Sequence, residues 1–98
     1  MKYEYPAKFI FEDSTGGYSV DFPDFDDIYT CGDDMDDAIY MAGDALAFML
    51  CTYEDEKRHI NKPSRPEDIP LLPGESVRMI SADTDEYRKI IKKCNIEK

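Results

Sequence analysis

Residues 16–50 decide the fold, and they read GGYSVDFPDFDDIYTCGDDMDDAIYMAGDALAFML. The two glycines that open the stretch form a turn, because glycine takes positive φ without steric cost. Residues 18–22 alternate and residues 28–31 are rich in β-forming side chains, which predicts two short strands. Asp33 or Asp34 then caps a long helix, with further aspartates in a first turn that favours negative charge.

The rest of the chain adds two strands and a second helix around this stretch. Residues 3–11 alternate apolar and polar side chains, so they predict a half-buried strand that pairs with 18–22 as a hairpin. Residues 61–74 hold four prolines and predict a helix-free connector held to the domain by Ile69, Leu71 and Leu72. Residues 75–82 predict a fourth strand and 86–94 a short helix. The order β-β-β-α-β-α predicts one α+β domain over residues 1–98, with the fourth strand beside the first.

The long helix is apolar nearly all round. One stripe repeats at helical spacing, through Ile39, Ala42, Leu46, Met49 and Tyr53. The opposite side carries Tyr40, Ala47, Phe48 and Cys51. One sheet covers one side, so either the C-terminal segment or another chain must cover the other. We therefore predict that the protein forms a homo-oligomer.

The charge of the chain is strongly acidic and unevenly placed. The formal net charge is −10, and residues 1–56 hold 15 acidic residues against two lysines. Residues 57–98 hold 7 acidic and 10 basic residues. An acidic surface repels phosphate, so the N-terminal half is not expected to bind nucleic acid. A basic protein is the more natural partner, although acids also simply keep a small protein soluble.

The cellular setting predicted for this sequence is cytoplasmic. Glu4 and Pro6 occupy the place where a signal peptide needs an apolar run, and the longest uncharged run, residues 45–53, is far short of the ~20 residues that span a bilayer. The three cysteines are widely spaced, which indicates neither a disulfide framework nor a zinc site. We expect no cofactor and no membrane association.

The sequence also offers two alternatives to protein binding, a metal-dependent nuclease and an RNA-associated module. Eight aspartates could converge on a divalent metal for phosphodiester cleavage: Asp21, Asp24, Asp26, Asp27, Asp33, Asp34, Asp36 and Asp37. Their spacing does not match a calcium loop, and caps and turns account for half of them. The lone His59 has no evident orienting partner for a nucleophilic relay. A basic stripe on the last helix offers the second alternative, an RNA-associated module: Arg88, Lys89, Lys92 and Lys93.

The order of motifs resembles the HicB family of antitoxins, the partners of HicA toxins. The residues that carry the resemblance are Tyr5-Pro6-Ala7, residues 16–24, Thr30-x-Gly32-Asp33, Ala38, Ala42, residues 44–46, residues 62–64 and residues 83–89. The resemblance implies a partial ribonuclease-H-like fold. It also implies a non-enzymatic function, which is to bind and neutralise a small basic HicA-type ribonuclease toxin by occluding its active site.

The sequence departs from the family pattern in two places. Phe25-Asp26-Asp27 stands where the family often has Leu-Pro-Gly. Many members also continue into a DNA-binding domain, about where this sequence ends, so we expect that domain to be absent and DNA binding not to occur. The middle of the first strand, residues 6–9, lacks the carboxylate that catalysis in a ribonuclease-H fold needs. The fold is thus expected without the nuclease chemistry.

These arguments predict a partner-binding site in two parts. The acidic loop would contribute charges that steer and pair with lysine or arginine, and the outer face of the helix would contribute buried area. The predicted residues are Asp24, Phe25, Asp26 and Asp27 in the loop, joined by Tyr40, Asp44 and Phe48 on the helix.

Overall fold

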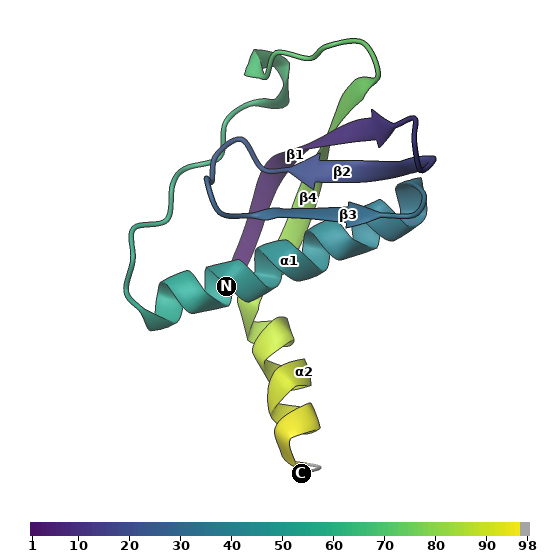
Figure 1. Ribbon diagram of the computed structural model, residues 1–98. Coiled ribbons are helices and arrows are strands. Elements are labelled where there is room, and N and C mark those ends of the chain that lie inside the picture. Colours follow the sequence, from purple (N-terminus) through teal and green to yellow (C-terminus); the bar gives the residue numbers. More distant parts are fainter. Residues whose placement is uncertain (97–98) are drawn as a thin grey trace.

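The computed structural model describes residues 1–96, with side chains through residue 90. Four strands form one antiparallel sheet, and a long helix lies along one face of it (Figure 1). The elements are β1 (Lys2–Glu12), β2 (Gly17–Asp21), β3 (Tyr29–Gly32), α1 (Met35–Asp55), a 3₁₀ turn (Pro66–Asp68), β4 (Glu75–Asp83) and α2 (Thr84–Ile96). The strand order β3-β2-β1-β4 confirms the predicted α+β fold and the place of the fourth strand beside the first.

The hydrophobic core lies between the sheet and α1. Alternate residues of a strand share one face, and in β1 that face carries Tyr5 and Phe9, which are 2% and 0% exposed. The register places Phe9 opposite Val20 of β2 and Tyr5 opposite Ile80 of β4, so all three strands contribute to one apolar layer. The alternation in the sequence therefore decided which face of the sheet is buried.

The passage from β3 into α1 is tight. The Asp34 carboxylate accepts the Asp37 N–H at 2.8 Å, and the Asp37 carboxylate accepts the Asp33 N–H at 2.9 Å. This reciprocal pair satisfies backbone donors that the first turn would leave open, which confirms the predicted aspartate cap. Gly32 lies against the same turn, and a Cβ built on it would be 2.4 Å from the Ala38 nitrogen.

α1 is buried on more than one side. The positions that pack onto the sheet include Ala38, Ala42, Leu46 and Leu50, each 0% exposed. Ala47 and Cys51, which the sequence placed on the opposite side, are also buried, and the Cys51 thiol approaches the Thr84 carbonyl at 3.7 Å. The C-terminal segment therefore covers part of the second side of α1. No helix within residues 1–96 has the length and apolar composition needed to cross a membrane.

Glu54, near the end of α1, fastens α2 to the domain. Its carboxylate accepts hydrogen bonds from the Tyr3 hydroxyl at 2.7 Å, from the buried Thr84 hydroxyl at 3.1 Å and from the Arg88 guanidinium at 3.1 Å. Burial would raise the pKa of Glu54, but these three donors outweigh it and hold that pKa below its usual value. Burial and the bond to Glu54 raise the pKa of Tyr3 to about 12. Beyond this anchor, α2 runs away from the body of the domain (Figure 1).

Only part of the connector between α1 and β4 packs against the rest of the domain. It contains the 3₁₀ turn, where the sequence predicted no helical turn at all. Ile69 is 9% exposed and packs into the domain as expected. The expectation is wrong for Leu71 and Leu72, which are 43% and 70% exposed, because only part of this irregular segment faces the domain.

Just beyond the end of α1, Lys57 has a left-handed backbone conformation although it is not a glycine. The Lys57 N–H donates to the Glu54 carbonyl at 3.2 Å, and the Arg58 N–H donates to the Tyr53 carbonyl at 2.9 Å. These two bonds form a Schellman motif, which needs positive φ at Lys57, and its φ is 55°. A side chain in this conformation is strained, because its Cβ crowds the following carbonyl oxygen.

Replacing Lys57 with glycine is therefore expected to raise the free energy of unfolding by about 1 kcal/mol. For a domain of this size, that corresponds to a rise in Tm of about 4–8 °C in thermal unfolding. Lys62→Gly is the matched control, because Lys62 is exposed and has no positive φ, and it should not stabilise the domain. An equal Tm for the Lys57→Gly variant and the parent protein would contradict strain at this position.

Candidate partner-binding surface

Three of the predicted site residues form a ridge on the outer face of α1. Tyr40, Asp44 and Phe48 are spaced four residues apart, so they occupy successive turns on one side of the helix. Tyr40 is 69% and Phe48 is 51% exposed, and Asp44 between them is also exposed. We call these three residues the α1 ridge. Two large aromatic side chains held in solvent on a rigid helix are a natural pair of anchors for another protein.

The acidic loop between β2 and β3 is tied to the connector. The Asp24 carboxylate accepts the Ser64 N–H at 2.9 Å and the Ser64 hydroxyl at 2.5 Å. The Asn61 side-chain amide donates to the Asp24 carbonyl at 2.6 Å. Asp24 therefore has a structural use that its place in an acidic run did not indicate.

Asp27 is engaged in the same way by the end of α1. Its carboxylate accepts the Tyr53 hydroxyl at 2.5 Å and lies 3.7 Å from the Arg58 guanidinium, which itself stacks over the Tyr53 ring at 4.1 Å. Burial and the bond to Asp27 raise the pKa of Tyr53 to about 12. Asp26 is exposed, and within residues 1–90 no hydrogen bond or ion pair engages its side chain. Of the three loop acids, Asp26 is the one whose side chain has no such contact within residues 1–90.

The structure corrects the expectation for Phe25. This side chain is 5% exposed and belongs to the core, where it meets the rings of Tyr5 and Tyr53 edge-on at centroid distances of 4.8 and 5.7 Å. A ring held by two others cannot also anchor a partner without opening the core. Phe25 was predicted as a site residue because the acidic residues beside it indicate a solvent-exposed loop.

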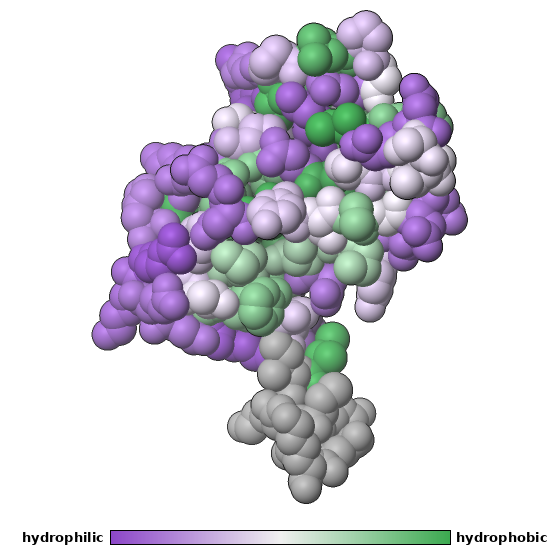
Figure 2. All heavy atoms as spheres, in the orientation of Figure 1, coloured by the Kyte–Doolittle hydropathy of each residue, from purple (hydrophilic) through white to green (hydrophobic). Residues whose placement is uncertain are grey.

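Two hollows flank the α1 ridge. The first, about 310 Å³, lies between α1 and β3 and is lined by Asp27, Ile28, Tyr29, Ala45, Phe48 and Met49. The second, about 420 Å³, lies between α1, the end of β4 and α2, and its lining includes Ile39, Tyr40, Gly43, Asp44, Ala47, Tyr87 and Ile90. We call them the β3 hollow and the α2 groove. Figure 2 shows this face of the molecule, where apolar and neutral side chains over α1 are bordered by hydrophilic ones.

Tyr29 is a member of this surface that sequence reasoning missed. It is 76% exposed and lines the β3 hollow together with Phe48. Its neighbour Ile28 is 1% exposed, so the side chain of Ile28 lies in the core while that of Tyr29 lies in solvent. The sequence showed four β-forming residues in a row, and without alternation it could not tell which of them face outward.

The candidate metal-binding aspartates and His59 have other places in the described part of the structure. Among the described side chains, no three His, Cys, Asp or Glu residues come close enough together to hold a metal ion. Asp34 and Asp37 form the cap of α1, and Asp24 and Asp27 bind the connector and Tyr53. His59 is exposed just beyond the end of α1.

The described basic residues of the stripe on α2 form ion pairs with carboxylates. Arg88 lies 3.1 Å from Glu54 and 2.9 Å from Asp55, and Lys89 lies 3.5 Å from Glu86. The side chains of Lys92 and Lys93 lie outside the described residues. Arg88 therefore attaches α2 to α1, whereas Lys89 pairs within α2, so both described cations of the stripe are engaged by carboxylates.

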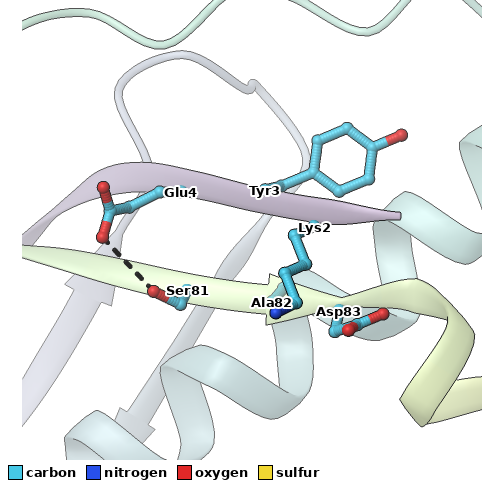
Figure 3. Close-up of a pocket in the computed structure, with 6 residues that line it drawn as sticks. All are labelled: Lys2, Tyr3, Glu4, Ser81, Ala82 and Asp83. Atoms are coloured by element: carbon cyan, nitrogen blue, oxygen red, sulfur yellow. Dashed lines mark hydrogen bonds between the residues drawn. The ribbon is translucent and has the colours of Figure 1, made fainter.

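A third and larger hollow, about 570 Å³, lies where β1 begins and β4 ends. Figure 3 shows that it is lined by neighbouring residues of these two strands, with the Ser81 hydroxyl donating to the Glu4 carboxylate at 3.3 Å. Lys2, Glu4 and Asp83 give it charges of both signs, so it lacks the single sign of charge that would select one class of ligand.

Comparison with known proteins identifies the family. Residues 4–71 match the model of a HicB-like antitoxin of bacterial toxin–antitoxin systems. Antitoxin HicB 1 of Photorhabdus laumondii is 36% identical over 84 residues, covering 82% of this chain and 54% of that protein. Antitoxin HicB 2 of the same organism is 38% identical over 60 residues, covering 61% of this chain and 42% of that protein. The chain thus spans about half the length of the curated relatives it matches.

Solved structures show the same fold. A toxin–antitoxin complex from Streptococcus pneumoniae contains a chain that matches with a TM-score of 0.80 at 24% identity, covering 89% of this chain and 73% of that one. The HicA3 and HicB3 toxin–antitoxin complex contains one that matches with a TM-score of 0.66 at 21% identity, covering 83% of this chain and 99% of that one. Family model, relatives and fold agree, and the chain belongs to the family of HicB-like antitoxins.

Proposed function

We propose that this protein is an antitoxin that binds a small basic ribonuclease toxin of the HicA type and neutralises it without catalysis of its own. Membership of the HicB-like family supports the antitoxin role, and a related fold occurs in a complex described as HicA3 with HicB3. The formal net charge of −10 supports a basic partner. The observation that carries the proposal is the α1 ridge, where Tyr40 and Phe48 stand exposed on either side of a carboxylate.

The two parts of the surface have different tasks. Exposed carboxylates such as Asp26 and Asp44 raise the rate of encounter with a basic partner, and this contribution weakens as salt screens it. Tyr40 and Phe48 supply apolar area that becomes buried only in the complex. Neutralisation then follows from steric cover of the toxin's active site, as in a protein inhibitor. Self-association of the antitoxin stays a prediction, since α2 covers only part of the second side of α1.

The partner to test is the product of the reading frame adjoining this gene, produced as a purified protein with RNA-cleaving activity. Asp26→Asn combined with Asp44→Asn should lower the affinity about tenfold at low salt and flatten the dependence of the affinity on salt between ~50 and ~500 mM. Titration calorimetry at several salt concentrations measures both quantities, and an RNA-cleavage assay measures neutralisation.

The matched control is Asp13→Asn combined with Glu67→Gln, which removes the same charge at exposed positions away from the α1 ridge. It should change the salt dependence much less. If the wild-type antitoxin does not bind the adjoining protein, or binds it with an affinity that ignores salt, the proposal fails.

A further inference from the structure

The α2 groove is a wedge between two helices that meet at one end and diverge at the other. The helices meet where Cys51 approaches Thr84 and Glu54 binds Arg88, and from there α2 runs away from the domain (Figure 1). The space that opens between them measures about 420 Å³, which is the size of a small binding pocket.

Gly43 forms part of the groove wall on α1, and the fold does not require a glycine there. Glycine within a helix costs about 1 kcal/mol relative to alanine. A Cβ built on Gly43 would meet only the Ser81 carbonyl oxygen at 3.9 Å, which is an ordinary contact. At Gly32 and Gly17, by contrast, backbone atoms lie 2.4 and 2.5 Å from the added carbon. Crowding within the chain therefore does not explain the glycine at position 43.

Apolar side chains on both walls of the groove remain in solvent. On α1, Tyr40 is 69% exposed, and on α2, Ile90 is 60% exposed. Both residues line the groove, so an occupant would bury apolar surface on two helices at once. Burial of a few large side chains in such a site supplies most of the affinity of a typical interface.

The charge of the groove selects the chemistry of its occupant. Among residues 1–90, its lining holds three carboxylates, Asp44, Asp83 and Glu86, and no lysine, arginine or histidine. Asp83 lies 3.6 Å from the N-terminal amine and Glu86 lies 3.5 Å from Lys89, while no ion pair engages Asp44 within residues 1–90. An apolar floor with an acidic rim complements an apolar side chain that is flanked by lysine or arginine.

We propose that the α2 groove receives an apolar side chain of the toxin, flanked by basic residues, and that Gly43 keeps the groove open for it. This inference rests on the proposed function and adds where on the antitoxin the toxin inserts. A second copy of the antitoxin fits less well, because it would bring a second net charge of −10 to an acidic rim. The orientation of α2, set by Glu54, then becomes part of the binding site.

Two variants test the groove, with the protein of the adjoining reading frame as the probe. Gly43→Leu fills the groove and, since leucine favours a helix, should leave the Tm unchanged or raised while the affinity falls about tenfold or more. Ile90→Lys changes a side chain that is 60% exposed, so it should fold normally and weaken binding similarly by placing a cation on the acidic rim. Lys57→Gly is the control, because it stabilises α1 at its far end and should leave the affinity unchanged.

Each result has a definite meaning. If the wild-type protein binds the probe and both variants bind it equally well, the groove is not the insertion site, and the proposed function stands. If the wild-type protein does not bind the probe, the proposed function falls and this inference falls with it. If the wild-type protein alone sediments as a dimer that Gly43→Leu converts to a monomer, the occupant is a second copy and the inference is overturned.

Discussion

Replacing Gly32 with alanine is expected to lower the free energy of unfolding by about 3 kcal/mol or more, which is a large part of the stability of a small domain. The new Cβ would lie 2.4 Å from the Ala38 nitrogen and 2.5 Å from its Cα, distances at which backbone must move. Ala38 is itself 0% exposed, so α1 cannot withdraw from β3 without opening the core. Urea denaturation followed by circular dichroism measures the loss.

Gly16→Ala is the matched comparison for this prediction. A Cβ at Gly16 meets no atom within 4 Å, but its φ of 76° is strained for alanine, so it should cost about 1 kcal/mol. The two glycines thus separate crowding from backbone strain. Equal losses of stability in the two variants would show that the backbone at the β3–α1 junction can shift to accept the added Cβ. The close packing of this junction would then not be a main source of stability.

Replacing Tyr40 and Phe48 together with alanine is expected to lower the affinity for the adjoining-frame protein about 100-fold, or about 3 kcal/mol. Both side chains are mostly exposed, at 69% and 51%, so their removal costs the free antitoxin little core packing. The loss should therefore appear in binding and in protection of RNA, with the Tm nearly unchanged. Titration calorimetry and thermal unfolding on the same preparation measure the two effects side by side.

Leu72→Ala provides the matched control for the aromatic pair. Leu72 is 70% exposed, but it lies on the connector, away from the α1 ridge. Its truncation should affect neither binding nor stability. If the double variant binds as tightly as the parent while the control behaves as expected, the toxin does not use the α1 ridge, and the acidic loop or another face must carry the interaction.

The fold was predictable because its signals are local. The alternation in β1, the glycines of the β1–β2 turn and the aspartates before α1 each act over a few residues. The candidate site was less predictable because exposure in a loop depends on distant partners. Asp24 meets Ser64 and Asp27 meets Tyr53, contacts that span 40 and 26 residues. No periodicity in the sequence encodes such pairs.

Local features of the sequence set the order of the elements, the buried face of the sheet, the capped start of α1 and the acidity of the domain. Long-range packing set which side chains of the acidic, aromatic stretch at residues 16–50 stay exposed. It buried Phe25 between Tyr5 and Tyr53, engaged Asp24 and Asp27, and left the α1 ridge in solvent. The physical reason is that local patterns fix which way a side chain points, whereas its exposure depends on which distant segment folds over it.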